Sequence, residues 1–312
     1  MKKVLIIGGT GYIGGRLSNY LISNGFEVII GTSKKLSHLP AQLSNYKSHY
    51  IDLASKDSLL VACEGVDIII HLASLNAKES FEYPKLAYKV NTLGTENLIN
   101  VSIEKKVKYF LYFSTAHVYG ESFTGLINET SSTNSIHPYA ASHEAAERIL
   151  LKNILDGGIN GAILRLSNVI GAPLFKEANC WMLFINDICK QAIINKEIII
   201  KSNAAIERDF ISMIDVCRIV RYFSNEMPNN DYPLYNVGSG KSQKLFDVAN
   251  IVVKRCEALF GFSPKLIYSK NQSAHTLQYQ ISKISNEMDF NPRVDISPDI
   301  DEVLSFCYSN FC

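Results

Sequence analysis

The stretch VLIIGGTGYIG at residues 4–14 decides the fold. Its apolar run predicts a buried strand, and a helical pattern begins directly after the glycines. Gly9, Gly11 and Gly14 fit the spacing GxGxxG, and Gly8 with Gly11 and Gly14 fits GxxGxxG. Glycines are required where a turn is tight, where the backbone approaches a pyrophosphate and where a helix packs closely on its strand. The stretch therefore predicts a phosphate-binding turn rather than an ordinary glycine-rich turn, with helix amides facing the phosphates.

Apolar runs and helical patterns alternate through the first 170 residues, which is typical of a parallel sheet with crossover helices. We expect strands at 3–8, 27–31, 47–51, 67–72, 109–114 and 162–166. We expect helices at about 12–24, 55–63, 81–105 and 138–156. The strands are dense in Ile, Val and Leu without alternation, so helices should cover both faces of the sheet. The fold class is therefore α/β, a Rossmann-type doubly wound parallel sheet.

After Gly171 the pattern changes. It predicts helices at 181–195 and 245–260, a strand at 197–201 and a segment with a helix at 210–223. These pieces indicate a smaller α/β lobe that is interleaved with the sheet domain. We expect residues 1–172 to form the nucleotide-binding domain, to which 210–238 return, and residues 173–209 and 239–312 to form the substrate lobe.

The composition excludes several classes of protein. Hydrophobic residues make up 47% of the 312 residues and charged residues 20%, which is ordinary for a globular chain. Lys and Arg total 31 against 30 Asp and Glu, so no global field attracts nucleic acid or an anionic membrane. Seven cysteines form no CxxC, so we expect reduced thiols and no metal site. No apolar run reaches about eighteen residues, so we expect no membrane span and a soluble, cytoplasmic protein.

The end of the second strand is where such domains choose between NAD and NADP, because an acid there bonds the ribose hydroxyls. Here GTSKK at residues 31–35 follows the strand and contains no acid. Ser33 and Lys34 could instead meet a 2′-phosphate, although lysines in a loop are also commonly solvated charges. The pattern favours NADP over NAD.

Further motifs follow in order along the chain. They are IDL at 51–53, HLAS at 71–74, NTLGTENL at 91–98, FSTAHVYG at 113–120, PYAASH at 138–143, LRLSNVIG at 164–171, RDF at 208–210 with DV at 215–216, and YNVGSG at 235–240. Together they resemble the extended short-chain dehydrogenase/reductase family, the nucleotide-sugar epimerases, dehydratases and reductases. The resemblance covers nearly the whole chain and implies an NAD(P)-dependent enzyme that acts on a nucleotide-activated sugar.

The resemblance also implies which residues bind the cofactor and the substrate. The cofactor positions are Gly8, Gly11, Tyr12, Ile13, Gly14, Ser33, Lys34, Asp52, Leu53, Leu72, Ala73, Ser74, Asn91, Tyr139 and His143. The substrate positions are Thr115, His117, Asn168 and Arg208, of which the last two match positions that hold a pyrophosphate. Two plainer interpretations remain open: Asp52 could cap a turn, and Arg208 could form a salt bridge with Glu207 or Asp209.

By the same resemblance Tyr139 exchanges a proton with a sugar hydroxyl and Thr115 orients the oxygen. A phenol with a pKa of about 10 needs nearby positive charge to act as a base, and the family supplies it with a lysine four residues later. This chain has His143 at that position, and a histidine with a pKa of about 6.5 is often neutral at pH 7. We favour a working enzyme with Thr115, Tyr139 and His143 as catalytic residues. A slow enzyme, a binding protein without turnover and a histidine that only packs remain open.

The motif around Thr115 narrows the reaction. In the similar sugar 4,6-dehydratases an Asp-Glu pair follows the threonine, whereas Ala116 and His117 stand here, so we expect oxidation or reduction at C4, with or without inversion. We expect an epimerase or a 4-keto-reductase/dehydrogenase for surface polysaccharide sugars, and a homodimer through the helices near 84–105 and 138–156. The alternatives are an NAD(P)-binding sensor and a structural subunit. The nucleotide base and the sugar stay open.

Overall fold

The computed structural model describes residues 1–120, 125–269 and 276–312, and the chain forms two compact units. Unit 1 comprises Met1–Ser122, Glu129–Leu166 and Cys217–Tyr235, and unit 2 comprises Phe123–Asn128, Ser167–Val216 and Asn236–Cys312. These boundaries differ from the expected ones at the positions where the chain passes from one unit to the other. Residues 167–172 and 210–216 belong to unit 2, because strand β8 (Asn168–Ile170) pairs with strand β10 (Glu207–Ser212) in a sheet of that unit.

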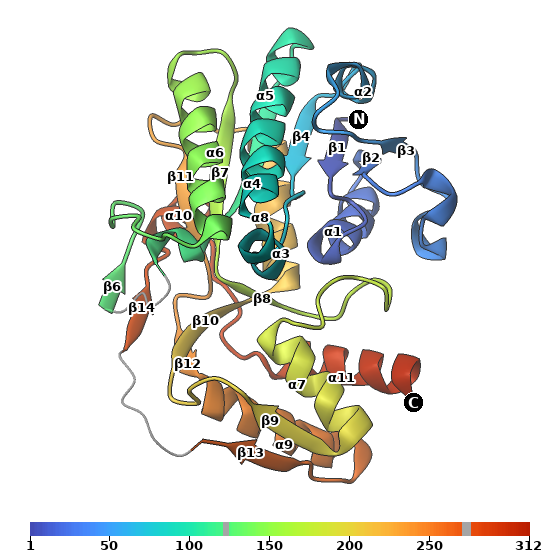
Figure 1. Cartoon of the computed structure of the whole chain (residues 1–312), viewed down its shortest axis with the longest axis vertical. Coiled ribbons are helices and arrows are strands. Elements are labelled where there is room, and N and C mark those ends of the chain that lie inside the picture. The colour runs from blue at the N-terminus through green and yellow to red at the C-terminus, as the bar shows by residue number, and fades with distance from the viewer. Residues whose placement is uncertain (121–124, 270–275) are drawn as a thin grey trace. The chain divides into compact units, whose positions relative to one another are not determined.

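Unit 1 is built on a seven-stranded sheet (Figure 1). Its strands are β1 (Lys3–Ile7), β2 (Glu27–Thr32), β3 (Ser48–Tyr50), β4 (Ile68–His71), β5 (Tyr109–Thr115), β7 (Gly161–Leu166) and β11 (Leu234–Val237). Their order is β11-β7-β5-β4-β1-β2-β3, and the pairs from β7 to β3 are parallel. The expected parallel sheet is confirmed, and every strand predicted for the first 170 residues belongs to it.

Helices cover both faces of this sheet, as a doubly wound fold requires. They are α1 (Tyr12–Ser23), α2 (Lys56–Ala62), α3 (Ala77–Glu82), α4 (Pro84–Ala87), the π-helical turn η3 (Tyr88–Leu93), α5 (Gly94–Glu104), α6 (Pro138–Leu155) and most of α8 (Met213–Glu226), with the 3-10 turn η4 (Ala116–Tyr119) after β5. The apolar sides of α2, α5 and α6 share one core cluster with Leu5, Ile7, Ile69, Phe110 and Tyr112 of the sheet. The side chains that alternate with these, such as Ile6, are buried on the other face, where α1 contacts β1 and β2.

The helix expected over 81–105 is interrupted. It consists of α3, α4, η3 and α5, with Tyr83 between the first two. A π-helical turn inserts an extra residue per turn, and such turns are frequent at functional sites. The apolar pattern through residues 86–101 survives the interruption, which is why the sequence predicted one continuous helix.

A buried ion pair joins α6 to β7. Nε and Nη2 of Arg165 donate to the carboxylate of Glu147 at 3.0 and 2.6 Å, and Nη1 donates to Tyr119 Oη at 2.9 Å. Arg165 and Glu147 are only 5% and 3% exposed. Burial alone lowers the pKa of Arg165, but the hydrogen bonds and the charge of Glu147 raise it above its usual value. The network therefore fixes the middle of α6 against the sheet and η4.

Unit 2 contains shorter sheets and three long helices. Its strands are β6 (Gly125–Ile127), β8, β9 (Glu197–Ile200), β10, β12 (Ser242–Lys244), β13 (Lys265–Tyr268) and β14 (Leu277–Tyr279). Its helices are α7 (Phe184–Asn195), α9 (Leu245–Phe260), α10 (Ser282–Met288) and α11 (Ser297–Phe311). Residues such as Ile188, Val252 and Leu304 form one core between α7, α9 and α11. The helices predicted at 181–195 and 245–260 are present, the first beginning at Phe184, whereas α11 was not predicted.

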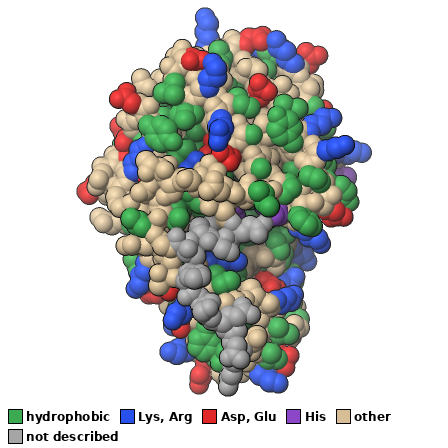
Figure 2. All heavy atoms as spheres, turned by 60° about the vertical axis from the view of Figure 1, so that its left-hand side comes forward, with side chains coloured by type: hydrophobic (Ala, Val, Ile, Leu, Met, Phe, Trp, Pro, Cys, Tyr) green, Lys and Arg blue, Asp and Glu red, His purple; other side chains and the backbone are tan. Residues whose placement is uncertain are grey.

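All seven cysteines are unpaired, and only Cys312 is exposed. Burial raises the pKa of Cys63, Cys180, Cys217 and Cys307 to about 12. In the space-filling view, basic and acidic side chains are interspersed over the face shown, as the balanced composition predicts (Figure 2). Within 1–120, 125–269 and 276–312, no helix is long and apolar enough to cross a membrane.

Candidate active site

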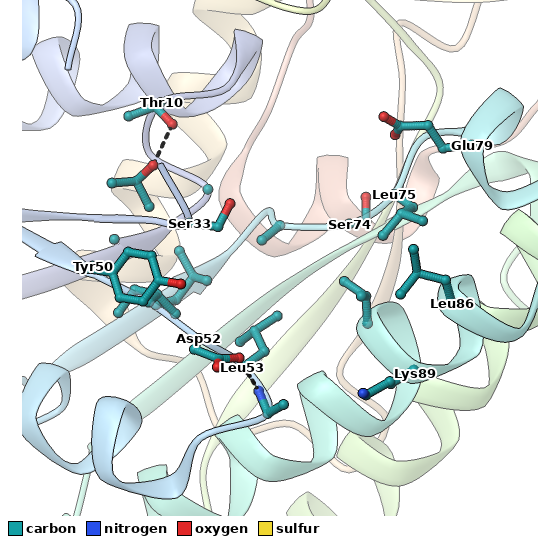
Figure 3. Close-up of a pocket in the computed structure, with 18 residues that line it drawn as sticks. Thr10, Ser33, Tyr50, Asp52, Leu53, Ser74, Leu75, Glu79, Leu86 and Lys89 are labelled. Atoms are coloured by element: carbon teal, nitrogen blue, oxygen red, sulfur yellow. Dashed lines mark hydrogen bonds between the residues drawn. The ribbon is translucent and has the colours of Figure 1, made fainter. Parts of the chain in front are cut away.

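A cavity lies in unit 1 at the carboxyl ends of β1 to β4. Strand β2 lies on one side of β1 and β4 lies on the other. The direction of the strand order therefore reverses between β1 and β4, which is the topological switch point of the sheet. Open α/β sheets bind ligands in the crevice that such a switch point creates. The cavity has a volume of about 600 Å³, and Figure 3 shows its lining from strand ends and from α3, α4 and η3.

The glycines of the turn between β1 and α1 allow its backbone to pack closely on the neighbouring segments. Gly8 has φ +89°, and a Cβ at this position would lie 2.9 Å from the backbone nitrogen of Ala73. A Cβ on Gly14 would lie 2.2 Å from the carbonyl oxygen of Gly8, so the helix could not approach the turn with any larger residue. Helix α1 begins at Tyr12 with Gly11 as N-cap, without a side-chain cap and without an acid in its first turn. Its N-terminal dipole therefore suits a phosphate.

The cavity lining includes six of the predicted cofactor residues: Gly8, Ser33, Asp52, Leu53, Ala73 and Ser74. The predicted residues Gly11, Tyr12, Ile13, Gly14, Lys34, Leu72, Asn91, Tyr139 and His143 are not part of it. Residues that the sequence did not single out also line the cavity, among them Thr10, Tyr50, Leu75, Glu79, Leu86 and Lys89 (Figure 3). Of these residues, Thr10 is the one that the sequence could have predicted, because it lies inside the glycine motif.

The end of β2 and the end of β3 carry polar groups at the cavity. Thr32 is buried and its hydroxyl pairs with that of Thr10 at 2.9 Å, while Ser33 is exposed to the cavity. Lys34 is exposed and contributes its backbone N–H to Thr32 Oγ1 at 3.1 Å. Asp52 accepts a hydrogen bond from the backbone of Ala54 at 2.9 Å. Asp52 therefore both caps a turn and lines the cavity.

Asn91 connects the loop after β4 with α6. Its Oδ1 accepts from the backbone N–H of Leu75 at 2.8 Å, and its Nδ2 donates to Ser142 Oγ at 3.0 Å. Its neighbour Thr92 donates to the carbonyl oxygen of Ser142 at 2.9 Å. Asn91 and Thr92 lie in the π-helical turn η3, so the irregular turn aims two successive polar side chains at the active-site helix.

Thr115, Tyr139 and His143 come together beside this connection. Thr115 is the last residue of β5, and its hydroxyl is close enough to the phenol of Tyr139 to act on the pKa of that phenol. Tyr139 is the second residue of α6, whose N-cap His137 accepts from the Tyr139 N–H at 3.2 Å. The imidazole of His143 stands one turn later, edge to face with the Tyr139 ring at 4.6 Å between centroids.

The two titratable groups of this cluster are both neutral at pH 7. Burial raises the pKa of Tyr139 above its usual value, and the hydrogen bond with Thr115 offsets part of that increase. Burial, together with a smaller effect of the nearby His117, lowers the pKa of His143 to about 3. His143 Nδ1 lies 2.8 Å from the hydroxyl of Tyr112, whereas its Nε2 is buried without a hydrogen-bond partner.

Two other histidines lie near the cluster. His117 of η4 is exposed, with its ring 6.2 Å from that of Tyr139. His71 is fully buried at the end of β4, where its Nε2 bonds with Thr95 Oγ1 at 2.9 Å. Its Nδ1 has no partner among the described residues, so this histidine is hydrogen-bonded on one side only.

The predicted phosphate-binding residues lie on neighbouring strands of unit 2. Asn168 of β8 donates to the backbone carbonyl oxygen of Asp209 on β10 at 2.9 Å. Arg208 is partly buried, which lowers its pKa, and its guanidinium has no hydrogen bond or ion pair with any described residue. Its neighbours are engaged elsewhere: Asp209 accepts from Ser239, and Glu207 accepts from the backbone of Leu277. The salt bridge that remained open for Arg208 is therefore not formed.

Comparisons with known proteins agree with this fold and these motifs. The chain is 27% identical to a putative UDP-glucose 4-epimerase of Methanocaldococcus jannaschii over 98% of this chain and 99% of the relative. It is 24% identical to human dTDP-D-glucose 4,6-dehydratase over 99% and 91%. The structure of UDP-glucose 4-epimerase from Bifidobacterium longum with NAD⁺ and UDP superposes with a TM-score of 0.82 at 22% identity, covering 99% of both chains. Likewise, that of RMD from Pseudomonas aeruginosa with NADPH has a TM-score of 0.81 at 22% identity, covering 99% of both.

The family assignment rests on the match to a family profile. The profile of the "NAD dependent epimerase/dehydratase family" matches residues 4–238, from β1 through β11, and so includes the glycine turn and the Thr115–Tyr139 cluster. The resemblance inferred from the ordered motifs is confirmed by this match. The chain belongs to the NAD dependent epimerase/dehydratase family.

Proposed function

We propose that this chain is an NAD(P)-dependent oxidoreductase that transfers a hydride at C4 of a nucleotide-activated sugar, as an epimerase or as a 4-keto-reductase/dehydrogenase. The observation that carries the proposal is the cluster of Thr115, Tyr139 and His143, in the same unit as a nucleotide-sized cavity over a glycine turn. The relatives named above, which are a putative 4-epimerase and a dehydratase of nucleotide sugars, support the substrate class.

Each residue of the cluster has a distinct role in this proposal. The nicotinamide, when bound, supplies or accepts the hydride. Tyr139 takes the proton of the sugar hydroxyl during oxidation and returns it during reduction, and Thr115 orients that oxygen through its own hydroxyl. His143 donates a hydrogen bond to the cofactor. Because His143 is neutral, it stabilises the phenolate of Tyr139 less than an ammonium group would.

In unit 2, Arg208 and Asn168 hold the pyrophosphate of the substrate. A partly buried guanidinium without a partner among the described residues is costly unless an anion binds it, and its planar fork suits phosphate oxygens. Ala116 and His117 replace the acid pair of the dehydratases, which favours transfer without loss of water, and we assign His117 to contact with the sugar. We extend the proposal to sugars for surface polysaccharides.

The test is a screen of UDP-, GDP-, CDP- and dTDP-sugars with NAD⁺ and NADP⁺. We expect one sugar nucleotide to give either inversion at C4, seen by NMR, or net reduction of the nicotinamide, seen by absorbance. Tyr139→Phe should abolish turnover while binding of the reduced cofactor, followed by its fluorescence, stays within twofold. Unchanged turnover in Tyr139→Phe would refute the assigned role.

For the cofactor we propose NADP in preference to NAD. The support is the absence of an acid after β2, together with Ser33 at the cavity. Lys34 contributes only if its exposed side chain turns toward the cofactor. Catalytic efficiency should be higher with NADP⁺ than with NAD⁺, and Lys34→Ala should remove most of the difference. Equal efficiency, or a preference for NAD⁺, overturns this part.

We also propose a homodimer through the helical segments 84–105 and 138–156. Phe81, Tyr83, Leu86, Tyr88 and Leu93 are each at least 40% exposed along this part of unit 1, which supports an apolar interface. Sedimentation should give a dimer, and Leu93→Asp should give a monomer that retains its cofactor. A monomeric wild-type protein contradicts the proposal.

The unpaired cysteines support a cytoplasmic place of action.

One observation favours the alternative of an NAD(P)-binding sensor. A neutral His143 beside a tyrosine of raised pKa is a weak proton-transfer system, as a protein that binds cofactor without turnover would have. The same screen decides between them. A sensor binds the cofactor but shows neither inversion nor hydride exchange with any sugar nucleotide.

A further inference from the structure

Strand β5 places a tyrosine next to the active-site histidine. Side chains alternate along a strand, so Phe110 and Tyr112 both point to the face that α6 covers. On α6, His143 begins a buried row that continues with Ala146, Leu150 and Ile154 at helical spacing. The packing of this strand on this helix therefore brings the hydroxyl of Tyr112 to Nδ1 of His143, at 2.8 Å.

The proton in this hydrogen bond can be assigned by counting the buried groups that each arrangement leaves unpaired. If Nδ1 carried the proton, it would donate to Tyr112, and the hydroxyl proton of Tyr112 would have no acceptor among the described residues. Nε2 would also be left as an unpaired acceptor. If instead Tyr112 donates to Nδ1, only the Nε2–H lacks a partner. Each unpaired buried group costs its desolvation, so the second arrangement is the more stable.

We propose that Tyr112 is a positioning residue: its hydroxyl donates to Nδ1 of His143 and holds the imidazole as the neutral Nε2–H form, which donates to an oxygen of the bound cofactor. This inference rests on the proposed function for the identity of the acceptor. The assignment of the proton depends only on the structure of unit 1.

The arrangement replaces a mobile cation with a fixed neutral donor. A lysine at this position would reach the cofactor on a flexible chain and would carry its own charge. The imidazole is shorter, and its neutral form can carry the proton on either nitrogen. It therefore needs a partner that selects the tautomer with the proton on Nε2. Tyr112 meets this need, and its own burial raises its pKa well above the usual value, which keeps it a proton donor.

The first measurement reads the proton directly. In ¹⁵N-labelled protein, the imidazole spectrum of His143 should show a protonated Nε2 and an unprotonated Nδ1. Tyr112→Phe keeps the ring and removes only the hydroxyl, so it should give a mixture of the two neutral forms. A matched control is available on the same strand: Tyr109 is equally buried, and its hydroxyl bonds with the carbonyl oxygen of Pro228. Tyr109→Phe should leave the His143 spectrum unchanged.

The second measurement is a double-mutant cycle on the affinity for NADPH, followed by its fluorescence. His143→Ala should weaken binding about fivefold to tenfold, as expected for one lost hydrogen bond, and Tyr112→Phe about twofold to fivefold. If Tyr112 acts through His143, the double variant should bind as His143→Ala does. Tyr109→Phe should add nothing in either background.

Each unfavourable result has a separate meaning. An unchanged His143 spectrum in Tyr112→Phe, a wild-type spectrum with the proton on Nδ1, or additive losses in the cycle overturns the role of Tyr112. If the wild-type protein binds neither NADPH nor NADH, the proposed function fails, and the spectra still decide whether Tyr112 sets the form of His143.

Discussion

Two arginines, one buried and one partly buried, differ completely in their surroundings. In unit 1, all three guanidinium nitrogens of Arg165 donate hydrogen bonds to Glu147 or Tyr119, and its cation lies 4.8 Å from the Tyr119 ring centre. In unit 2, Arg208 has no partner among the described residues, and burial lowers its pKa. A cation that is paired inside the protein stabilises the fold, whereas one that is left unpaired stabilises a complex with an anion. We propose that this difference separates a structural arginine from one that binds the substrate.

The largest test breaks the paired arginine. Glu147→Ala leaves the Arg165 cation buried without its carboxylate partner, and loss of one partner of a buried pair costs about 3–5 kcal/mol. Urea unfolding should show this loss. Replacing both members, Arg165→Met with Glu147→Leu, should restore most of the stability because no charge is left unpaired. A loss below about 1 kcal/mol in Glu147→Ala would show that water already reaches the pair.

The second test removes the unpaired arginine. Arg208→Ala should weaken binding of the sugar nucleotide found in the screen about 10-fold to 100-fold, because charged hydrogen bonds contribute roughly 1.5–3 kcal/mol. Its free energy of unfolding should be unchanged or higher. Arg255 of the same unit is paired with Asp301 at 2.6 Å, so Arg255→Ala is the control: it should lower stability and leave affinity unchanged. Equal affinity in Arg208→Ala and the wild type contradicts the binding role.

A third test extends the comparison to a buried group that stays neutral. The pKa of His143 falls from 6.5 to about 3 on folding, so its contribution to stability is complete above pH 6.5 and is lost as the pH falls toward 3. Each pH unit below 6.5 costs about 1.4 kcal/mol. Between pH 7 and pH 5 the wild type should therefore lose about 2 kcal/mol more than His143→Gln, which accepts from Tyr112 but does not titrate. Parallel curves would show that His143 does not change its pKa on folding.

The smallest expected effect belongs to a surface pair on the same helix as Glu147. Glu144 and Arg148 of α6 bond at 2.6 Å, but Arg148 is 76% exposed. Arg148→Ala should cost only about 0.3–0.5 kcal/mol. Comparing this variant with Glu147→Ala contrasts an exposed ion pair within α6 with a buried ion pair between α6 and β7. A loss of several kcal/mol would remove burial as the explanation.

The sheet and the glycine turn were predictable because they follow from hydrophobic periodicity and from backbone geometry. Helix α11 could have been predicted as well: Ser297 and Pro298 mark its start, and Ile300, Val303, Leu304 and Cys307 follow at helical spacing. Strands β6 and β14 have three residues each and leave no readable pattern. The π-helical turn was hidden because one inserted residue leaves the apolar row nearly continuous.

Of the candidate site, the sequence predicted the residue types but not their partners. Thr115, Tyr139 and His143 could be placed together from the motifs. Tyr112 lies in an apolar strand, YFLYFST, where a tyrosine is indistinguishable from a core aromatic residue. Its role depends on the contact between its hydroxyl and Nδ1 of His143 across β5 and α6. This contact follows from side-chain packing, which the spacing of residues in the sequence does not predict.

The unpaired cysteines give the protein a built-in set of reporters. Cys63 and Cys217 are buried in unit 1, while Cys180, Cys189, Cys256 and Cys307 are buried in unit 2. A thiol reagent should modify Cys312 at once and the other six only as their surroundings open. Mass spectrometry of the labelled peptides would therefore record the opening rate of each unit separately, without any engineered label. The same measurement with bound nucleotide would show in which unit the opening becomes slower.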